Sequence, residues 1–387
     1  VSALRGKVAL IEKEKMGGEC LNAGCVPSKA FIKVSRVLQT IKKAKKYGIQ
    51  DIHYKLSFED VKKRVREVIE EIAPHDSIQR YESLGVECIS GVAEILSPWE
   101  IRVNQKVLKT KNIVIATGSK PIIPQIPGLD KISYHTSETI WSLENLPERL
   151  LIVGSGAITC ELSQAFSRLG VITTIVSLSS NLLPKEDEDV SVEIQKIFKD
   201  EGINLFLDCE NLSFQKEVGE QSLSFQSGEM KEVVEFDELL IATGRRANKN
   251  LPGAEALNLD EGVHGTYFHD DYLRTNFPNI YVCGDCAGPY QLSHMAGHQA
   301  WYAAVNALFS PFKKFKVDYS VVPWVIYSDP EIARVGVSEK EATKLKIDFE
   351  VTKYYLRDLD RAITEGETNG FVKILTLKGS DKIIGAA

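Results

Sequence analysis

The sequence predicts an α/β protein with two similar strand–helix units and a smaller α+β part, and three observations lead to this prediction. Short apolar strands alternate with amphipathic helical stretches over about three quarters of the chain. Two strands, at 114–115 and 240–241, end in the same Ala-Thr-Gly turn, which indicates a weak internal repeat. From about residue 318 the pattern changes to alternating strands such as 371–375, which is typical of an antiparallel sheet.

Length and composition exclude several classes of protein. The 387 residues exceed one ordinary core, so we expect two or three domains. An apolar content of 43% excludes a disordered or fibrous protein. A net charge of −6 gives no sequence-wide attraction for nucleic acid, and no apolar stretch approaches the roughly 18 residues of a membrane span. Seven cysteines are too sparse for a secreted disulfide scaffold, so we expect a reducing, cytoplasmic setting.

The first unit opens with an apolar strand that leads into a loop containing glycine and cysteine. Its expected elements, in order, are a strand at 8–11, helices at 27–47 and 58–82, and strands at 86–90, 101–103 and 112–116. The proline-rich stretch 121–128 is interpreted as a crossover between domains.

The second unit opens with a strand–helix–strand pattern. Its expected elements are strands at 150–153 and 173–176 around a helix at 160–169, then a helix at 187–201 and β-like segments up to 241. A strand at 280–283 and a helix at 293–308 follow. Because both units share the Ala-Thr-Gly turn, we expect two nucleotide-binding units in one chain.

A glycine turn lies between the first strand and the helix of the second unit. Gly154 and Gly156 permit a tight turn and let backbone N–H groups approach a pyrophosphate at the helix N-terminus. Thr159 stands where a third glycine is usual, and the turn alone also fits an ordinary strand–helix connection. The flanking strand, helix and strand favour a dinucleotide site.

The residue expected to contact the ribose lies at a strand end about 20 residues after the glycine turn. In the second unit it is Ser177, so no carboxylate repels a 2′-phosphate and no arginine follows to bind one. NADPH is therefore permitted and not demanded. In the first unit the corresponding residue is Glu12, which alone also fits a solvated carboxylate. The same 23-residue interval places its matching glycine before residue 1.

Both ends of the chain have unusual sequences. Residues 1–4 are typical of the last turn of a helix, and the chain stops in the apolar run 383–387. We therefore interpret the sequence as an internal piece of a longer protein.

Two cysteines five residues apart lie just before a predicted helix. Pro27 can start that helix, which places the Cys25 thiol at a helix N-terminus where the dipole and Lys29 stabilise a thiolate. Such a thiolate suits thiol–disulfide exchange with Cys20. A structural disulfide is disfavoured because so short a loop gains little, and no further ligands for zinc stand nearby.

The stretch 17–29 resembles the redox-active disulfide motif of the class I pyridine nucleotide-disulfide oxidoreductases, on the dihydrolipoamide dehydrogenase and mercuric reductase branches, because Ser28 precedes Lys29. The resemblance extends over essentially the whole chain, through 116–118, the Gly154 turn with Glu161, 242–245, 280–285 and 329–336. It implies two Rossmann-like domains, one for FAD and one for NAD(P), and a partial α+β dimerisation domain.

The resemblance also implies roles for individual residues. Cys25 is expected to be the thiol that lies against the flavin, and Cys20 the thiol that meets substrate. Lys29 is expected to lie near the flavin and to pair with Glu161, and these four residues form the predicted catalytic set. The expected cofactor contacts are Glu12, Lys13, Gly18, Lys29, Gly91, Ala116, Thr117, Gly118, Gly154, Gly156, Ala157, Ile158, Ser177, Gly244, Arg245, Gly284, Asp285 and Ser293.

The resemblance divides the chain into four segments. We expect FAD-binding segments at 1–120 and 245–317, an NAD(P)-binding domain at 121–244, and an incomplete interface domain at 318–387. The family's general acid/base, a histidine supported by a glutamate in the interface domain, has no counterpart after Asp329. The expected partners are a second copy of the chain and a small-molecule or lipoyl-type disulfide, or a metal-thiolate.

Rival signals are weaker. Cys283 and Cys286 form a second C-x-x-C, but the intervening Gly-Asp matches a flavin contact. His294 and His298 share a predicted helix face without the glutamate of an HExxH motif, so we expect no metal site. The leading hypothesis is an FAD-dependent NAD(P)H:disulfide oxidoreductase; the alternatives are a flavin NAD(P)H oxidase or diaphorase and a non-catalytic nucleotide-binding scaffold.

Overall fold

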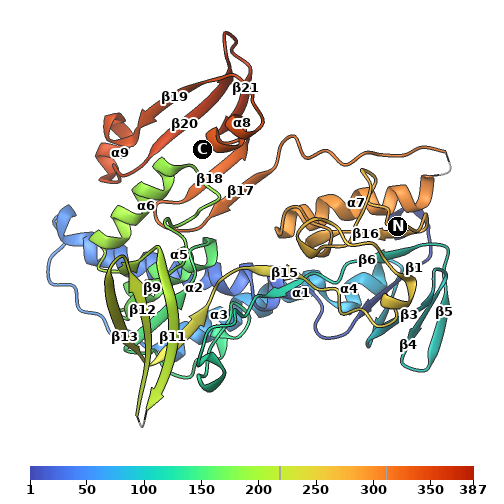
Figure 1. Cartoon of the computed structure of the whole chain (residues 1–387), viewed down its shortest axis with the longest axis horizontal. Coiled ribbons are helices and arrows are strands. Elements are labelled where there is room, and N and C mark those ends of the chain that lie inside the picture. The colour runs from blue at the N-terminus through green and yellow to red at the C-terminus, as the bar shows by residue number, and fades with distance from the viewer. Residues whose placement is uncertain (218, 311) are drawn as a thin grey trace. The chain divides into compact units, whose positions relative to one another are not determined.

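The computed structural model describes residues 1–217, 219–310 and 312–387 (Figure 1). Three separated segments of the chain, Val1–Val26, Glu67–Ile122 and Arg245–Tyr319, fold together as a first unit. The remaining segments, Pro27–Arg66, Ile123–Gly244 and Ser320–Ala387, fold together as a second unit. Each unit is described by itself below.

The first unit contains two pairs of parallel strands. Strand β1 (Val8–Glu12) pairs with β2 (Val86–Ser90), and β6 (Ile113–Ile115) pairs with β16 (Ile280–Val282). All three residues of β16 are buried, which explains why this strand is apolar throughout and does not alternate. It also contains the helices α1 (Gly18–Asn22), α4 (Ile78–Ser83) and α7 (Ser293–Phe309), and among its 3₁₀ turns is η8 (Gly284–Cys286).

Two smaller antiparallel sheets complete the first unit. One is a meander of β3 (Ala93–Ser97), β4 (Glu100–Val103) and β5 (Lys106–Lys109). The other joins β7 (Ser119–Pro121) to β15 (Arg245–Ala247). This short ladder brings the two Ala-Thr-Gly turns of the sequence repeat to the ends of paired strands.

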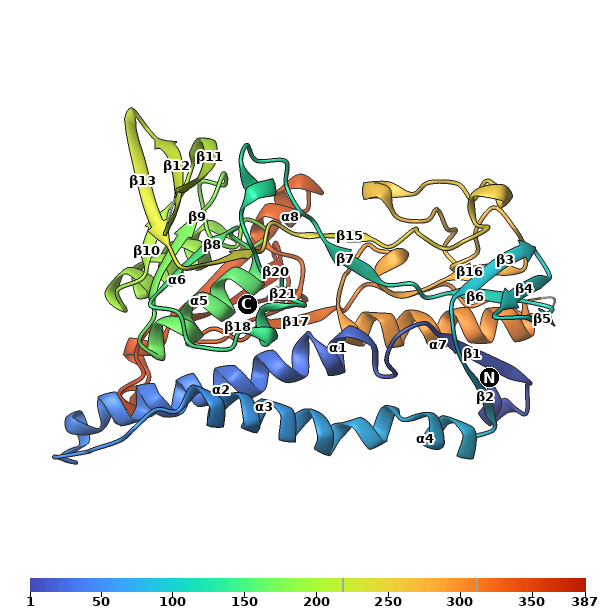
Figure 2. The ribbon, with the colours of Figure 1, turned by 90° about the horizontal axis from the view of Figure 1, so that it is seen from below.

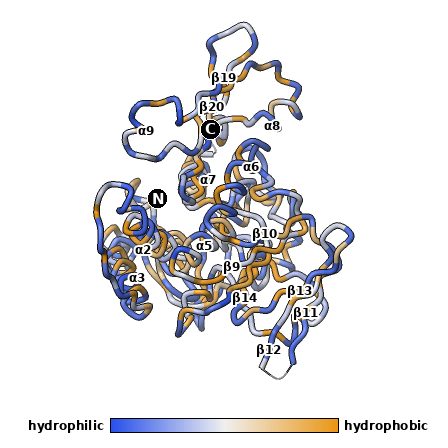
Figure 3. Tube along the Cα trace, turned by 90° about the vertical axis from the view of Figure 1, so that its left-hand side faces the viewer, coloured by the Kyte–Doolittle hydropathy of each residue, from blue (hydrophilic) through white to orange (hydrophobic). Residues whose placement is uncertain are grey.

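A four-stranded parallel sheet forms the core of the second unit. Its strand order is β10 (Asn204–Phe206), β9 (Ile172–Val176), β8 (Arg149–Val153) and β14 (Glu238–Ile241). Helices α5 (Ala157–Arg168) and α6 (Glu188–Asp200) connect its strands. Leu151, Ile152 and Leu240 are fully buried, and Figure 3 shows the apolar residues around β9 and β14 inside this unit.

Two antiparallel sheets also belong to the second unit. A meander runs through β11 (Cys209–Glu217), β12 (Glu220–Ser227) and β13 (Met230–Phe236). The C-terminal sheet has the order β17 (Pro323–Ile326), β18 (Ile332–Gly336), β21 (Ile383–Ala386), β20 (Phe371–Leu377) and β19 (Phe349–Tyr355), with α8 (Glu339–Lys344) and α9 (Asp360–Glu365). The predicted antiparallel C-terminal sheet is therefore present.

The second unit contains most of two long helices, α2 (Cys25–Lys43) and α3 (Phe58–Ile72). The parts of these helices within residues 27–66 run side by side (Figure 2). The prediction of one helix over 58–82 is wrong in its second half, because α3 ends at Ile72 and α4 starts separately at Ile78. Pro74 removes a backbone donor, and Ser77 accepts a hydrogen bond from the Arg80 amide as the N-cap of α4.

The other predicted helices and strands are present with ends that shift by a few residues. Helix α2 begins at Cys25, two residues before the predicted start, and α5 begins at Ala157 instead of residue 160. The β11–β13 meander was predicted only as β-like segments, because its strands alternate weakly. The division into four domain segments stays a prediction. Among the described residues, no helix combines the length and the apolar character that crossing a membrane requires.

A buried ammonium group joins the start of α6 to the C-terminal sheet of the second unit. Lys373 on β20 is 0% exposed and donates to Asp187 at 2.8 Å, Asp189 at 2.9 Å and Glu339 at 2.7 Å. Burial alone raises the pKa of Asp187, but hydrogen bonds from Lys373 and two backbone amides outweigh it and lower that pKa. The three carboxylates are close enough to hold a metal ion, and the ammonium group lies among them instead.

We expect Lys373→Met to lower the free energy of unfolding by about 3–5 kcal/mol, because it leaves the buried Asp187 carboxylate without a cation; Asp189 keeps its pair with Lys353. Urea unfolding at pH 7 measures the loss, and Lys378→Met, at an exposed position of the following turn, is the matched control. The deficit should shrink as the pH falls through the carboxyl range, because protonated carboxyls need no cation. Equal unfolding midpoints for K373M and K378M would contradict the assignment.

Candidate active site

The turn between α1 and α2 brings the two predicted redox cysteines together. Cys20 lies in α1, and Cys25 is the first residue of α2. Between them, the amides of Ala23 and Gly24 both donate to the Glu19 carbonyl, at 2.8 and 2.6 Å, which reverses the chain. Both cysteines are half-buried thiols. The site is therefore built by local structure within the first unit.

The contact between the two thiols changes the pKa of Cys20. The hydrogen bond with Cys25, together with burial, raises the pKa of the Cys20 thiol far above its ordinary value. Ser293, the first residue of α7, opposes this rise, and its Oγ lies 3.5 Å from the Cys25 Sγ. Cys20 therefore holds its proton more tightly than an ordinary thiol does, and Cys25 lies at the N-terminus of α2.

The predicted pair of Lys29 and Glu161 is present in the second unit. The Lys29 Nζ lies 2.9 Å from Glu161 Oε2, and the Glu161 side chain is only 8% exposed. The Tyr327 amide donates to the other Glu161 oxygen at 2.9 Å, and the Tyr327 ring lies 4.5 Å from Nζ. Tyr327 was not predicted, because nothing in its sequence neighbourhood indicates contact with α2 or α5.

The strand ends of the first unit fit a bound dinucleotide. The Gly91 amide donates to the Glu12 carbonyl at 2.9 Å, which holds the ends of β1 and β2 together. Gly118 has a φ of +70°, and a Cβ added there would meet no atom within 4 Å, so the backbone is open to a ligand. Gly284 has a φ of +75° and lies against Ala296 of α7. Ligands of parallel sheets bind at such strand ends.

The remaining predicted contacts of the first unit lie in the same strand–loop connections. Glu12 accepts the Glu14 amide at 2.9 Å, Lys13 pairs with Glu14, and Gly18 starts α1 with a φ of +59°. The Thr117 hydroxyl donates to the Asn248 carbonyl at 2.6 Å, next to Ala116. The carboxylate of Asp285 accepts a hydrogen bond from Ser119 at 2.6 Å, and Ser119 is a residue that the sequence did not single out.

The glycine turn of the second unit fits a pyrophosphate. Gly154 has a φ of +144°, and a Cβ there would lie 2.3 Å from the Ala242 carbonyl, so only glycine is accommodated. A Cβ at Gly156 would meet no atom within 4 Å, which leaves space beside the N-terminus of α5, formed by Ala157 and Ile158. The Thr159 hydroxyl is buried there without a hydrogen-bond partner among the described residues. The backbone N–H groups at the N-terminus of α5 suit an anionic ligand.

The end of β9 lacks a carboxylate, as the sequence indicates. Ser177 is 4% exposed, and its hydroxyl accepts the Ser179 amide at 3.0 Å. The predicted repeat turn at Gly244 follows β14 with a φ of +129°. Ser177 therefore shapes the loop after β9 without contributing a charge.

The rival cysteine pair and the histidines have structural partners. Burial raises the pKa of Cys283 to about 12, and Cys286 is fully buried against the Ile115 carbonyl. His298 Nε2 donates a hydrogen bond to the Asp318 carbonyl, 2.9 Å away, and the His298 ring contacts Tyr302. These features favour packing over a second redox pair.

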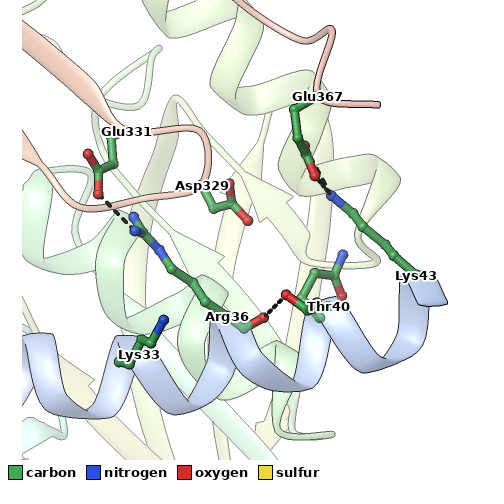
Figure 4. A pocket seen from close by; sticks show the side chains of 8 residues that line it. Lys33, Arg36, Thr40, Lys43, Asp329, Glu331 and Glu367 are labelled. Atoms are coloured by element: carbon green, nitrogen blue, oxygen red, sulfur yellow. Dashed lines mark hydrogen bonds and ion pairs between the residues drawn. The ribbon is translucent and has the colours of Figure 1, made fainter. Parts of the chain in front are cut away.

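A polar pocket of about 490 Å³ opens along α2 in the second unit (Figure 4). Its charged lining residues are Lys33, Arg36, Lys43, Asp329, Glu331 and Glu367. Arg36 pairs with Glu331 and Lys43 with Glu367, at 2.8 and 2.9 Å. Because its three cations face three carboxylates, this pocket has no net charge to attract an ionic ligand.

The structure combines a thiol pair at a helix N-terminus with dinucleotide-type turns in both units. This combination is typical of one class of protein, the enzymes that move electrons between bound nucleotides and thiols. The family model "Pyridine nucleotide-disulphide oxidoreductase" matches residues 1–304, and the dimerisation-domain model of that family matches 322–387. The chain therefore belongs to the pyridine nucleotide-disulphide oxidoreductase family.

Three relatives show the extent of the similarity. The chain is 32% identical over 386 residues to dihydrolipoyl dehydrogenase of Chlamydia trachomatis, covering 98% of this chain and 81% of that protein. It is 30% identical over 384 residues to mercuric reductase of Bacillus cereus, covering 99% and 60%. A solved structure of the flavoprotein disulfide reductase RclA from Escherichia coli, as its Cu(II) complex, matches with a TM-score of 0.83 and 25% identity, covering 100% and 84%.

Family membership confirms the predicted fold class and enzyme class. The protein is an FAD-dependent oxidoreductase that uses a pyridine nucleotide and acts in disulfide chemistry. The α/β prediction with nucleotide-binding domains and a dimerisation domain is likewise confirmed. The roles of single residues stay predictions.

We expect Cys25→Ala to speed alkylation of Cys20 in the reduced protein, because the hydrogen bond that raises the Cys20 pKa is removed. Iodoacetamide labelling at pH 8, followed by mass spectrometry of the Cys20 peptide, measures the rate. Cys160→Ala is the control, because that thiol is fully buried. An unchanged Cys20 rate in C25A would show that Cys25 does not set its ionisation.

Proposed function

We propose that Cys20 and Cys25 form the redox-active disulfide of this enzyme and carry an electron pair between NADH or NADPH and a disulfide, dithiol or metal-thiolate substrate. The observation that carries the proposal is the hydrogen-bonded thiol pair with Cys25 at the start of α2. FAD, when bound, supplies the two-electron exchange between the pyridine nucleotide and these thiols.

With a disulfide substrate, the thiol chemistry balances on the chain's own residues. The Cys20 sulfur attacks one substrate sulfur, forms a mixed disulfide and releases the first substrate thiolate. The Cys25 thiolate then attacks the Cys20 sulfur, forms the Cys20–Cys25 disulfide and releases the second thiolate. The proton that Cys20 loses passes to Cys25 along their hydrogen bond and then to the first released substrate thiolate, which leaves Cys25 as a thiolate for the second attack.

Lys29 and Glu161 support this site in the proposal. Lys29 lies four residues after Cys25 on α2, about one turn along the helix. Glu161 holds the ammonium group in one orientation. We assign Lys29 to the flavin side of the site, as the family resemblance implies.

The cofactor contacts follow the two units. For FAD the proposed residues are Glu12, Lys13, Gly18, Gly91, Ala116, Thr117, Gly118, Arg245, Gly284, Asp285 and Ser293. For the pyridine nucleotide they are Gly154, Gly156, Ala157, Ile158, Ser177 and Gly244. The open backbone at Gly118 and Gly156 supports both assignments.

A homodimer is the proposed assembly. The dimerisation-domain match covers the C-terminal sheet, and this sheet exposes apolar side chains: Val351 is 41%, Val372 48% and Ile383 60% exposed. Apolar exposure of this kind supports burial against a second copy. The proposed compartment is the reducing cytoplasm, which fits seven unbridged cysteines.

We expect anaerobic reduction of the FAD-loaded protein by NADH or NADPH to produce a long-wavelength absorption band that depends on the Cys25 thiolate. The band should disappear in Cys25→Ser and persist in Cys88→Ser, a matched control away from the site. Bleaching of the flavin without this band in the wild type would favour a flavin NAD(P)H oxidase or diaphorase.

We expect NADH and NADPH to reduce the flavin of the wild-type protein at rates within about tenfold of each other, since Ser177 neither repels nor binds a 2′-phosphate. Ser177→Glu should lower kcat/KM for NADPH at least tenfold and leave that for NADH within about threefold, because a carboxylate repels the extra phosphate. Stopped-flow flavin reduction measures both. Ser180→Glu, in the same exposed loop, is the control.

A further inference from the structure

A chain of hydrogen bonds in the first unit runs from the turn that carries Cys20 to Asp285. Arg245, the first residue of β15, donates from Nη2 to Glu19 Oε2 at 2.5 Å. It also donates from Nε to the Ser119 hydroxyl at 2.8 Å and from Nη2 to the Ser119 carbonyl at 3.1 Å. The Ser119 hydroxyl in turn donates to Asp285 Oδ2 at 2.6 Å.

The direction of every proton in this chain is determined by chemistry. A guanidinium group only donates, and an ionised carboxylate only accepts. The Ser119 hydroxyl must therefore accept from Arg245 and donate to Asp285, which uses its single proton. Reversal of any bond would leave one partner without a donor or an acceptor.

Backbone pairing holds the centre of the chain rigid. Arg245 lies opposite Pro121 in the β7–β15 ladder, and Ser119 lies opposite Ala247. The Arg245 side chain is only 12% exposed, so its ion pair with Glu19 is partly shielded from water. Glu19 precedes Cys20 directly in α1. The position of the Cys20 turn is thus tied to a sheet and not only to its own helix.

The charges in this chain do not cancel. Arg245 is one cation beside two carboxylates, Glu19 directly and Asp285 through Ser119. Negative charge near a thiol disfavours the thiolate, and a neighbouring cation favours it. Arg245 therefore offsets the charge of Glu19, the residue directly before Cys20.

We propose that Arg245 is a positioning residue for the Cys20–Cys25 pair, which holds the Cys20 turn through Glu19 and offsets the charge that opposes thiol ionisation. This inference rests on the proposed redox role of the two cysteines. It gives Glu19 and Arg245 opposite effects on the thiols: loss of the carboxylate favours the thiolate, and loss of the guanidinium disfavours it.

The test compares Glu19→Gln, Arg245→Met and the double variant in the reduced, FAD-loaded protein. The readout is the rate of thiol alkylation by iodoacetamide at pH 7, with mass spectrometry to assign the site. E19Q should react about three- to tenfold faster than wild type, and R245M about three- to tenfold slower. The double variant should return toward the wild-type rate, because both charges are removed.

Matched controls separate charge from structure. Arg246→Met and Glu14→Gln remove the same charges at neighbouring exposed positions and should leave the rate within about twofold. Arg245→Lys keeps the charge but loses the planar fork, so it should react near the wild-type rate. General loss of structure would shift E19Q and R245M in the same direction.

The outcomes also separate this inference from the proposed function. Equal rates in E19Q, R245M and wild type, or shifts of the same sign, would overturn the inference even when the Cys25-dependent absorption band is present. If R245M does not fold, the sign of the E19Q effect alone decides, because a slower or unchanged rate contradicts the proposal. Absence of the band in the wild type would instead count against the proposed function.

Discussion

Glu161 places a carboxylate inside the second unit, and the need to balance that charge organises the segments around it. A buried carboxylate without a cation costs several kcal/mol, about 3–5 by the usual measure of a broken pair. Lys29 and the Tyr327 amide each satisfy one oxygen at 2.9 Å. Glu161 lies on α5, and its two partners come from α2 and from the segment after β17. One electrostatic requirement therefore aligns three segments that are far apart in the sequence, and Phe31 packs on Phe166 beside it, with ring centroids 4.8 Å apart.

The requirement that a buried charge has an oppositely charged partner also applies at two further places, each within one unit. Lys373 gathers three carboxylates from α6, its preceding loop and α8, and Arg245 gathers Glu19 and Ser119 from α1 and β7. Lys373 joins β20 to α6 and α8, and Arg245 joins the paired strands β7 and β15 to α1, so each cation connects a strand to helices that do not share its ladder. Because partial removal leaves a charge without a partner, such clusters make the arrangement of their elements specific.

Local sequence predicts the parts of this site that local structure builds. The cysteine spacing, the glycine turns and the start of α2 could be predicted, because each depends on residues within one turn or loop. The Lys29–Glu161 pair was predicted only through the family resemblance. The sequence did not single out Ser119, Tyr327 and Lys373. Their partners are set by strand register and by packing between segments more than 100 residues apart. The exception is Glu339, a partner of Lys373 that lies closer in the sequence. The sequence predicted that the helix continues past Ile72, whereas α3 ends there, because Pro74 lacks the backbone N–H that would continue it.

Helix α2 links the two kinds of prediction. It carries Cys25 in its first turn and Lys29 one turn later, so regular helix geometry sets their separation along the axis at about 6 Å. The thiol therefore needs no long-range contact to acquire a nearby helix dipole, whereas the lysine needs Glu161 to hold one orientation. Chemistry that depends on the dipole is encoded within a few residues, and chemistry that depends on the orientation of a charge requires the whole unit to fold. This division explains why the thiol motif can be predicted from the sequence, while the contact between Glu19 and Arg245 becomes visible only in the structure.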